Sequence, residues 1–455
     1  MKFILFFIFV LSSTAVFAEP LRLSGTLILS IEKGTIEAEL KLSNIPKIKN
    51  YYIFINSGLN IEYFRDKDDS FNYAYRKKYN DEYSYESFGY YLPDNSGKEK
   101  FLPASLNFKY TGKFPVISDM DKASEHGDWK GNIAFNGKTL RSDGMQASWY
   151  PVLYDIDKDV RFDSVAYDIE IKCADCKSIY LNGSSPVTGR AGKFKSEKPV
   201  ELMLFAGDFE IEKSNGSYFL NAGLSNKQMV YFGNVISSFE KFYQNKLNLP
   251  YGEDVVFIHT TPISKNNSWL FVAYPSIINV GHFESGLSDL IDDEKSNWFK
   301  PFIAHELAHY YFGTYRKFNS ELGDMLSESF SEYISLKLVK ELIGEDVFNS
   351  IVDSKHKELT NTKLIPFSGI KSSSDYGDRN LYVYAYAPTN WIKLEHAIGE
   401  ENMWRWINKL LTVESEFTDY DFLIKTLGDV LNDKALLEVI ESRYFSAVIP
   451  FESNH

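Results

Sequence analysis

The chain has 455 residues, of which 49 are Lys or Arg and 62 are Asp or Glu. Its net charge of −13 argues against a nucleic-acid-binding surface, because such surfaces need clustered Lys and Arg. With 44% hydrophobic residues, 15 Pro and 27 Gly, the composition excludes a disordered or collagen-like chain. The length predicts two or three domains.

Residues 1–18 have the pattern of a secretory signal peptide. Lys2 precedes a short apolar run, and the run closes on Val16-Phe-Ala18, with small residues at the −3 and −1 positions. We therefore expect cleavage after Ala18, a secreted or periplasmic protein, and no transmembrane segment in the mature chain. An uncleaved N-terminal anchor is the alternative.

Residues 19–208 are predicted to form an all-β, sandwich-like domain. Runs such as 21–29 and 161–171 alternate apolar and polar residues, and turn signals such as Asn182-Gly separate the runs. The stretch 51–91 is rich in Tyr, which suits half-buried strands; a carbohydrate or peptide platform is the alternative.

Cys173 and Cys176 form a C-x-x-C pair. In an oxidising compartment this pair indicates a local disulfide that closes a tight loop. A redox motif or half of a zinc knuckle would suit a reducing compartment, but a knuckle needs a second pair of ligands and no His is near.

Residues 209–455 are predicted to form a second, mostly helical domain with some sheet. A strand is expected over 254–259. Helical periodicity covers 226–247, 291–313, 322–343, 388–412 and 420–445.

The chemistry concentrates in the sequence His305-Glu306-Leu-Ala-His309. Positions i and i+4 of a helix lie one above the other, so His305 and His309 can present two imidazoles to one zinc ion while Glu306 projects beside them. Pro301 suits the start of this helix and Gly313 its end.

A second amphipathic helix supplies a third ligand. Glu328 follows His309 after 18 residues, and Glu332 lies one turn further along the same face. A catalytic zinc takes three protein ligands and keeps one position open for water, and two His with one Glu satisfy it.

This pattern resembles the aminopeptidase N / leukotriene hydrolase family of gluzincin metallopeptidases. Residues 305–313 are similar to the family's H-E-L-A-H-Q-W-F-G, and residues 326–333 to its L-N-E-G-F-A-x-Y. Residues 384–399 are similar to its Tyr-led helix ending in L-E-x-x-x-G, and residues 148–155 to its W-F-P-x-x-D segment.

The resemblance implies a thermolysin-like catalytic domain over 209–455. It also implies one Zn²⁺ ion on His305, His309 and Glu328, with Glu306 as general base. Tyr384 would donate a hydrogen bond to the oxyanion, although Tyr382 and Tyr386 lie within two residues of it. Glu332 is expected to hold the free nitrogen of a zinc-bound His, or else to be a solvated Glu.

The sequence departs from this family in two respects. The G-x-M-E-N strand, whose carboxylate reads the substrate's α-amine, does not occur; the corresponding region is 273–285, where Glu284 is a candidate replacement and a plain loop Glu is the alternative. The chain also ends at His455, soon after Tyr384, so a short form without the family's C-terminal helical domain is expected.

These observations predict an exported zinc metallopeptidase that acts on peptides, an aminopeptidase in the first instance. An endo- or oligopeptidase on the same zinc centre is the first alternative. A catalytically silent exported binding protein is the second. The oligomeric state and the physiological peptide are not predicted.

Overall fold

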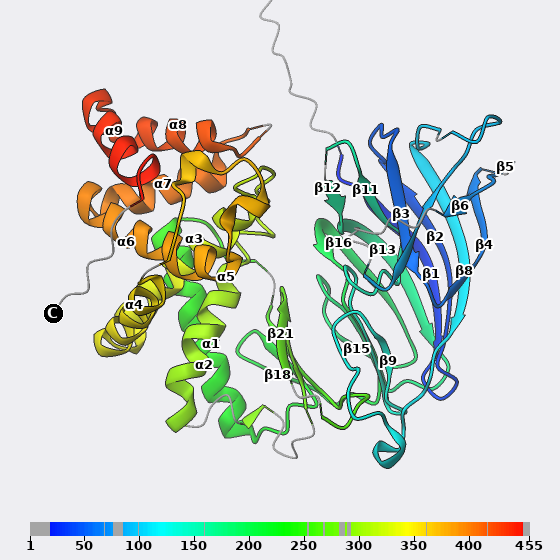
Figure 1. Ribbon diagram of the computed structural model, residues 1–455. Helices are drawn as coiled ribbons and strands as arrows, with labels where there is room; N and C mark the ends of the chain where they lie inside the picture. Colours follow the sequence, from blue (N-terminus) through cyan, green and yellow to red (C-terminus); the bar gives the residue numbers. More distant parts are fainter. Residues whose placement is uncertain are drawn as a thin grey trace, which may run out of the picture.

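The computed structural model describes residues 19–448, apart from 68, 76–84, 99, 159, 253, 267–268, 282–286, 289–292, 361 and 416. The expected signal peptide and Glu284 lie outside the described residues. The molecule is a mixed α and β protein in which a β-domain stands beside a mostly helical part (Figure 1). Among the described residues, no helix is long and apolar enough to cross a membrane.

The first part of the described chain forms three β-sheets around one hydrophobic core. A large sheet has the order β16-β13-β1-β2-β8-β4-β5, and two smaller sheets have the orders β15-β14-β17-β10-β9 and β12-β11-β3-β7-β6. The strands are β1 (Arg22–Ser30), β2 (Thr35–Ser43), β3 (Tyr51–Asn56), β4 (Leu59–Asp66), β5 (Asp69–Ser70), β6 (Ala74–Tyr75), β7 (Ser87–Tyr91), β8 (Ser105–Lys113), β9 (Ile133–Phe135), β10 (Thr139–Ser142), β11 (Val152–Asp155), β12 (Val160–Phe162), β13 (Ser164–Cys173), β14 (Ser178–Leu181), β15 (Val187–Thr188), β16 (Ala191–Glu201) and β17 (Leu204–Gly207).

The alternation in the sequence explains these sheets. In β2 every second residue is buried, as expected for a strand with one face on the core. The Tyr-rich stretch is partly in the core: Tyr51 and Tyr52 are buried in β3, whereas Tyr73 and Tyr75 are exposed.

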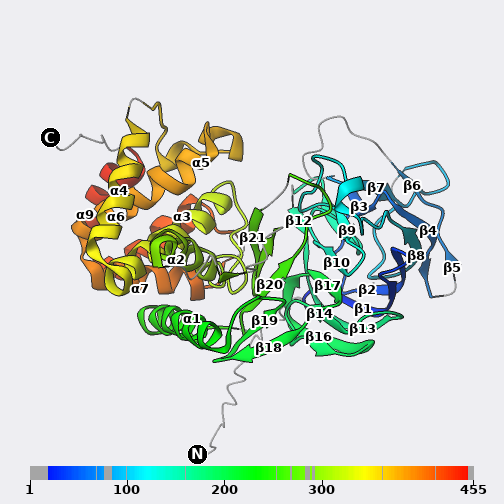
Figure 2. The ribbon, with the colours of Figure 1, turned by 90° about the horizontal axis from the view of Figure 1, so that it is seen from below.

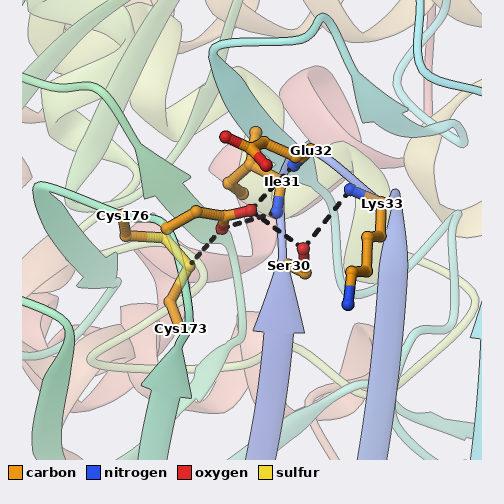
Figure 3. Close-up of a disulfide and its surroundings, with 7 residues drawn as sticks. Ser30, Ile31, Glu32, Lys33, Cys173 and Cys176 are labelled. Carbon is orange, nitrogen blue, oxygen red and sulfur yellow. Dashed lines mark hydrogen bonds between the residues drawn. A yellow bond between two sulfur atoms is a disulfide. The ribbon is translucent and has the colours of Figure 1, made fainter.

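Cys173 and Cys176 form a disulfide between the end of β13 and the start of β14 (Figure 3). Asp175, between them, accepts hydrogen bonds from the Ser30 hydroxyl at 2.8 Å and from the backbone N–H groups of Ile31 and Glu32 at 2.8 and 2.9 Å. The loop therefore anchors the turn that follows β1.

A fourth sheet lies between the β-domain and the helices (Figure 2). Its order is β18-β19-β20-β22-β21, with β21 at one edge. One face packs on the helices through Phe219, Phe257 and Ile277, and the next residues along these strands pack on β14 and β17. The strands are β18 (Ile211–Ser214), β19 (Ser217–Leu220), β20 (Val256–Thr260), β21 (Trp269–Ala273) and β22 (Ser276–Val280).

The helices lie on the side of the fourth sheet that faces away from the β-domain (Figure 1). The α-helices are α1 (Asn226–Leu247), α2 (Asp293–Ala308), α3 (Gly323–Leu338), α4 (Glu345–Leu359), α5 (Arg379–Leu381), α6 (Ala387–Ile398), α7 (Glu400–Thr412), α8 (Tyr420–Leu431) and α9 (Lys434–Ile440). Three π-helical segments continue α3, α5 and α9; they are η3 (Val339–Ile343), η6 (Tyr382–Tyr386) and η7 (Glu441–Phe445).

The helix expected over 226–247 is α1, but several other expectations need correction. Pro301 lies inside α2 and not at its start, and α2 ends at Ala308. Gly399 and Asn432, both at positive φ, divide the expected long helices 388–412 and 420–445. Helix α4 is missing from the expected helices, although Phe348, Ile351 and Val352 follow a helical spacing and pack together in one apolar cluster.

Candidate metal centre

Helices α2 and α3 bring the three predicted ligands together. His305 lies in the last turn of α2, and His309 lies one residue beyond its end. Here the backbone N–H of His309 bonds to the carbonyl of Glu306, so the chain tightens as the helix ends. Glu328 projects from the second turn of α3.

The ligand atoms have the spacing of a tetrahedral zinc site. The Nε2 atoms of His305 and His309 are 3.1 Å apart, and Oε2 of Glu328 lies 3.5 Å from the first and 3.3 Å from the second. Ligand atoms about 2.1 Å from a tetrahedral zinc ion lie about 3.4 Å from one another. Oε2 of Glu328 is also buried without a hydrogen-bonding partner among the described residues. The donor set and this orphaned oxygen therefore fit one zinc ion.

Both imidazoles have polar neighbours at Nδ1, the ring nitrogen that is not part of the triangle of ligand atoms. Nδ1 of His305 lies 2.7 Å from Oε2 of Glu332, and Nδ1 of His309 lies 3.2 Å from both the carbonyl oxygen of Phe312 and Oγ of Ser331. An Nδ1–H bonded in this way leaves Nε2 free to ligate a metal. Glu332 therefore lies beside His305, one of the candidate ligands.

The charges in this cluster stabilise one another in the metal-free protein. Burial opposes the imidazolium of His305, but the nearby carboxylates of Glu328 and Glu332 outweigh it and raise the pKa of His305 to about 10. Burial likewise opposes ionisation of Glu332, but the His305 hydrogen bond and the ammonium of Lys355 lower its pKa to about 2. The pKa of Glu328 is lowered by both histidines, again against burial.

Glu306 and Tyr384 lie beside the ligands. Glu306 is the half-buried neighbour of His305 in the last turn of α2. The ring of Tyr384, in the π-helical segment η6, lies 5.8 Å from the ring of His305. Tyr382 and Tyr386 are fully buried, and the Tyr382 hydroxyl donates to the carbonyl of Ile365. Of the three tyrosines, Tyr384 is therefore placed beside the metal ligands.

The phenol of Tyr384 keeps its proton. Burial and the negative charge of Glu328 raise the pKa of Tyr384, although Arg379 acts in the opposite direction. A neutral phenol donates one hydrogen bond, which is the property that an oxyanion donor needs.

Two cations at the site were not predicted from the sequence. Arg379, in α5, donates two hydrogen bonds to Asp324 and lies 3.2 Å from Oε1 of Glu328. Lys355, in α4, lies 2.6 Å from Oε1 of Glu332. Neither residue stands at a motif spacing from His305 or Glu328, so only the tertiary contacts identify them.

The fold can be compared with known proteins. No family model and no curated protein matches the sequence. Native leukotriene A4 hydrolase from Saccharomyces cerevisiae matches the structure with a TM-score of 0.66 at 14% identity, covering 96% of this chain and 69% of the hydrolase. An M1 zinc metallopeptidase from Deinococcus radiodurans matches with a TM-score of 0.62 at 12% identity, covering 95% of both chains.

A mutant of the Deinococcus peptidase, bound to a Tyr-Ser-Ala substrate, matches equally well, with a TM-score of 0.62 at 13% identity. At these identities the likeness concerns the fold. The resemblance seen in the sequence therefore extends to the three-dimensional structure. The chain has the fold shared by an M1 zinc metallopeptidase and leukotriene A4 hydrolase.

Proposed function

We propose that this protein is a zinc metallopeptidase that hydrolyses peptide bonds. The observation that carries the proposal is the triangle of His305 Nε2, His309 Nε2 and Glu328 Oε2, whose sides of 3.1, 3.5 and 3.3 Å suit one zinc ion. Glu306 and Tyr384 flank this triangle. The shared fold supports the same assignment.

Each residue of the site has its own role in the proposed reaction. When bound, zinc lowers the pKa of a water molecule towards neutrality and polarises the substrate carbonyl. Glu306 accepts a proton from the attacking water on its carboxylate and delivers it to the leaving amine. The Tyr384 hydroxyl donates a hydrogen bond to the carbonyl oxygen as negative charge develops on it. Glu332 keeps the Nδ1 proton of His305 in place.

A Glu306→Gln variant tests this proposal. Loss of the general base should lower kcat by about 10²- to 10⁴-fold on peptides and aminoacyl anilides, with zinc content unchanged. Glu401→Gln, an exposed carboxylate on α7, is the matched control and should retain full activity. A wild-type protein that binds no zinc, or a Glu306→Gln variant with full activity, would contradict the proposal.

Aminopeptidase activity is the specific form that we propose. An oligopeptidase that does not require a free N-terminus is the second candidate, because residues 273–281, the described start of the region that corresponds to the G-x-M-E-N strand, contain no carboxylate for a substrate α-amine. Paired peptides with free and acetylated N-termini separate the two. An aminopeptidase cleaves only the free peptide, whereas an oligopeptidase cleaves both.

We also propose that the protein is exported. The disulfide between Cys173 and Cys176 is the state that an oxidising compartment favours. N-terminal sequencing of protein recovered outside the cytoplasm should begin at Glu19; recovery of the full chain from the cytoplasm would contradict export. Zinc bound without turnover on a broad peptide panel would instead favour an exported binding protein.

A further inference from the structure

Lys355 connects the metal centre to the segment that carries Tyr384. Its Nζ lies 2.6 Å from Oε1 of Glu332 and donates a hydrogen bond of 2.6 Å to the carbonyl oxygen of Tyr384. The Lys355 and Glu332 side chains are only 13% and 14% exposed. These contacts are therefore screened much less by solvent than a surface ion pair.

The sequence explains why the Tyr384 carbonyl accepts a side-chain donor. In an α-helix this oxygen would accept from the N–H of residue 388, but residue 388 is proline and has no N–H. The surrounding segment is π-helical, and the N–H of Ala387 bonds to the carbonyl of Tyr382, five residues back. The ammonium of Lys355 supplies the donor that Pro388 cannot.

The other contact of Lys355 leads to the metal ligands. Glu332 uses Oε1 for Lys355 and Oε2 for Nδ1 of His305, at 2.7 Å. Three successive contacts thus run from the Tyr384 backbone through Lys355 and Glu332 to His305. The residues come from three different elements, α4, α3 and α2, in addition to η6.

We propose that Lys355 is a positioning residue that fixes the Tyr384 phenol relative to the imidazole of His305. The inference rests on the proposed function, in which these two side chains act on the same substrate carbonyl. One ammonium bonds both the Tyr384 carbonyl and the Glu332 carboxylate, so it fixes the distance between these two groups. Lys355 touches neither the substrate nor the reacting atoms in this scheme, and it acts through Glu332 and through the backbone of Tyr384.

The test compares Lys355→Met with Lys357→Met. Lys357 lies on the same helix, is exposed and forms no side-chain hydrogen bond or ion pair among the described residues, so it controls for the loss of one charge from α4. Three quantities are measured: zinc affinity by chelator competition, amide hydrogen exchange of residues 382–391 in the metal-free protein, and kcat and KM on a peptide substrate.

Lys355→Met should weaken zinc binding by about 10- to 100-fold, because Glu332 loses the cation that orients it. Exchange of residues 382–391 should become faster, and kcat should fall by about 10- to 100-fold as the phenol moves out of place. KM should change less than kcat, since the substrate's ground-state contacts remain. Lys357→Met should match wild type in all three, and Lys355→Arg, which keeps a multi-donor cation, should recover part of each loss.

Glu332→Gln separates the two contacts of Lys355. It breaks the contact to the metal ligands and leaves the Tyr384 carbonyl bonded, so it should weaken zinc binding without accelerating exchange of residues 382–391. If Lys355→Met leaves that exchange at the Lys357→Met level, Lys355 does not hold the Tyr384 segment and the proposal is wrong. It is equally wrong if zinc affinity is unchanged.

The outcome for Lys355 is distinguishable from the outcome for the proposed function. A wild-type protein that binds zinc but hydrolyses no peptide contradicts the peptidase assignment alone. In that case the measurements of zinc affinity and of amide hydrogen exchange still decide whether Lys355 positions Tyr384 and His305.

Discussion

Replacing Glu332 by glutamine removes one negative charge from the support of the metal centre with almost no change in shape. Glu332 faces Nδ1 of His305 at 2.7 Å and Nζ of Lys355 at 2.6 Å, and all three side chains are at least 86% buried. The variant therefore leaves Lys355 as a buried cation without its carboxylate partner. It also weakens the hydrogen bond that orients His305.

The magnitude follows from these contacts. A pKa of about 2 in place of the ordinary 4.5 corresponds to roughly 3 kcal/mol in favour of the ionised Glu332 side chain in the metal-free protein. The free energy of unfolding at pH 7 should fall by about this amount. Zinc affinity should fall by about 10- to 100-fold, as when the carboxylate partner of a ligand histidine is lost elsewhere.

The assay is chelator competition for zinc affinity, together with urea unfolding of the metal-free protein. Glu358→Gln, an exposed carboxylate on α4, is the control and should change neither quantity by more than about 0.5 kcal/mol. If Glu332→Gln binds zinc within about twofold of wild type and unfolds at the same urea concentration, the carboxylate does not support His305 and the reasoning fails.

Three further predictions concern other parts of the molecule. Tyr384→Phe should lower kcat by about 10²- to 10³-fold with zinc content unchanged, whereas the buried Tyr386→Phe should not; equal activities would mean that another group donates to the oxyanion. Because the pKa of His305 is about 10 without metal, zinc binding at pH 7 must displace a proton, so affinity should fall about tenfold per pH unit on acidification; calorimetry in two buffers would detect the released proton or contradict it. Asp175→Ala, which removes three hydrogen bonds from the turn after β1, should lower the free energy of unfolding by about 1–3 kcal/mol and leave kcat unchanged, as urea unfolding and kinetics would show.

The local sequence predicts the two histidines of the candidate triad because their spacing is local, whereas the packing of α3 against α2 brings Glu328 to them. A spacing of four residues places His305 and His309 close together at the end of α2, and the amphipathic α3 carries Glu328 and Glu332 on one face. The alternation of β1 and the periodicity of α1 are equally local, and the two elements occur where the sequence predicts them, at 21–29 and 226–247. Helix boundaries were less predictable: α2 continues through Pro301, and Gly399 interrupts what periodicity alone presents as one helix.

Tertiary structure decided among three neighbouring tyrosines and added two cations beside the candidate triad. Tyr382, Tyr384 and Tyr386 are equivalent by composition, and the π-helical turn places only Tyr384 beside His305. Lys355 and Arg379 approach the carboxylates of α3 from helices far along the chain, at no characteristic spacing. Contacts of this kind depend on how elements pack and not on a periodic pattern. For that physical reason the sequence by itself predicts the candidate zinc ligands and base, and the packed structure adds the side chains that contact them.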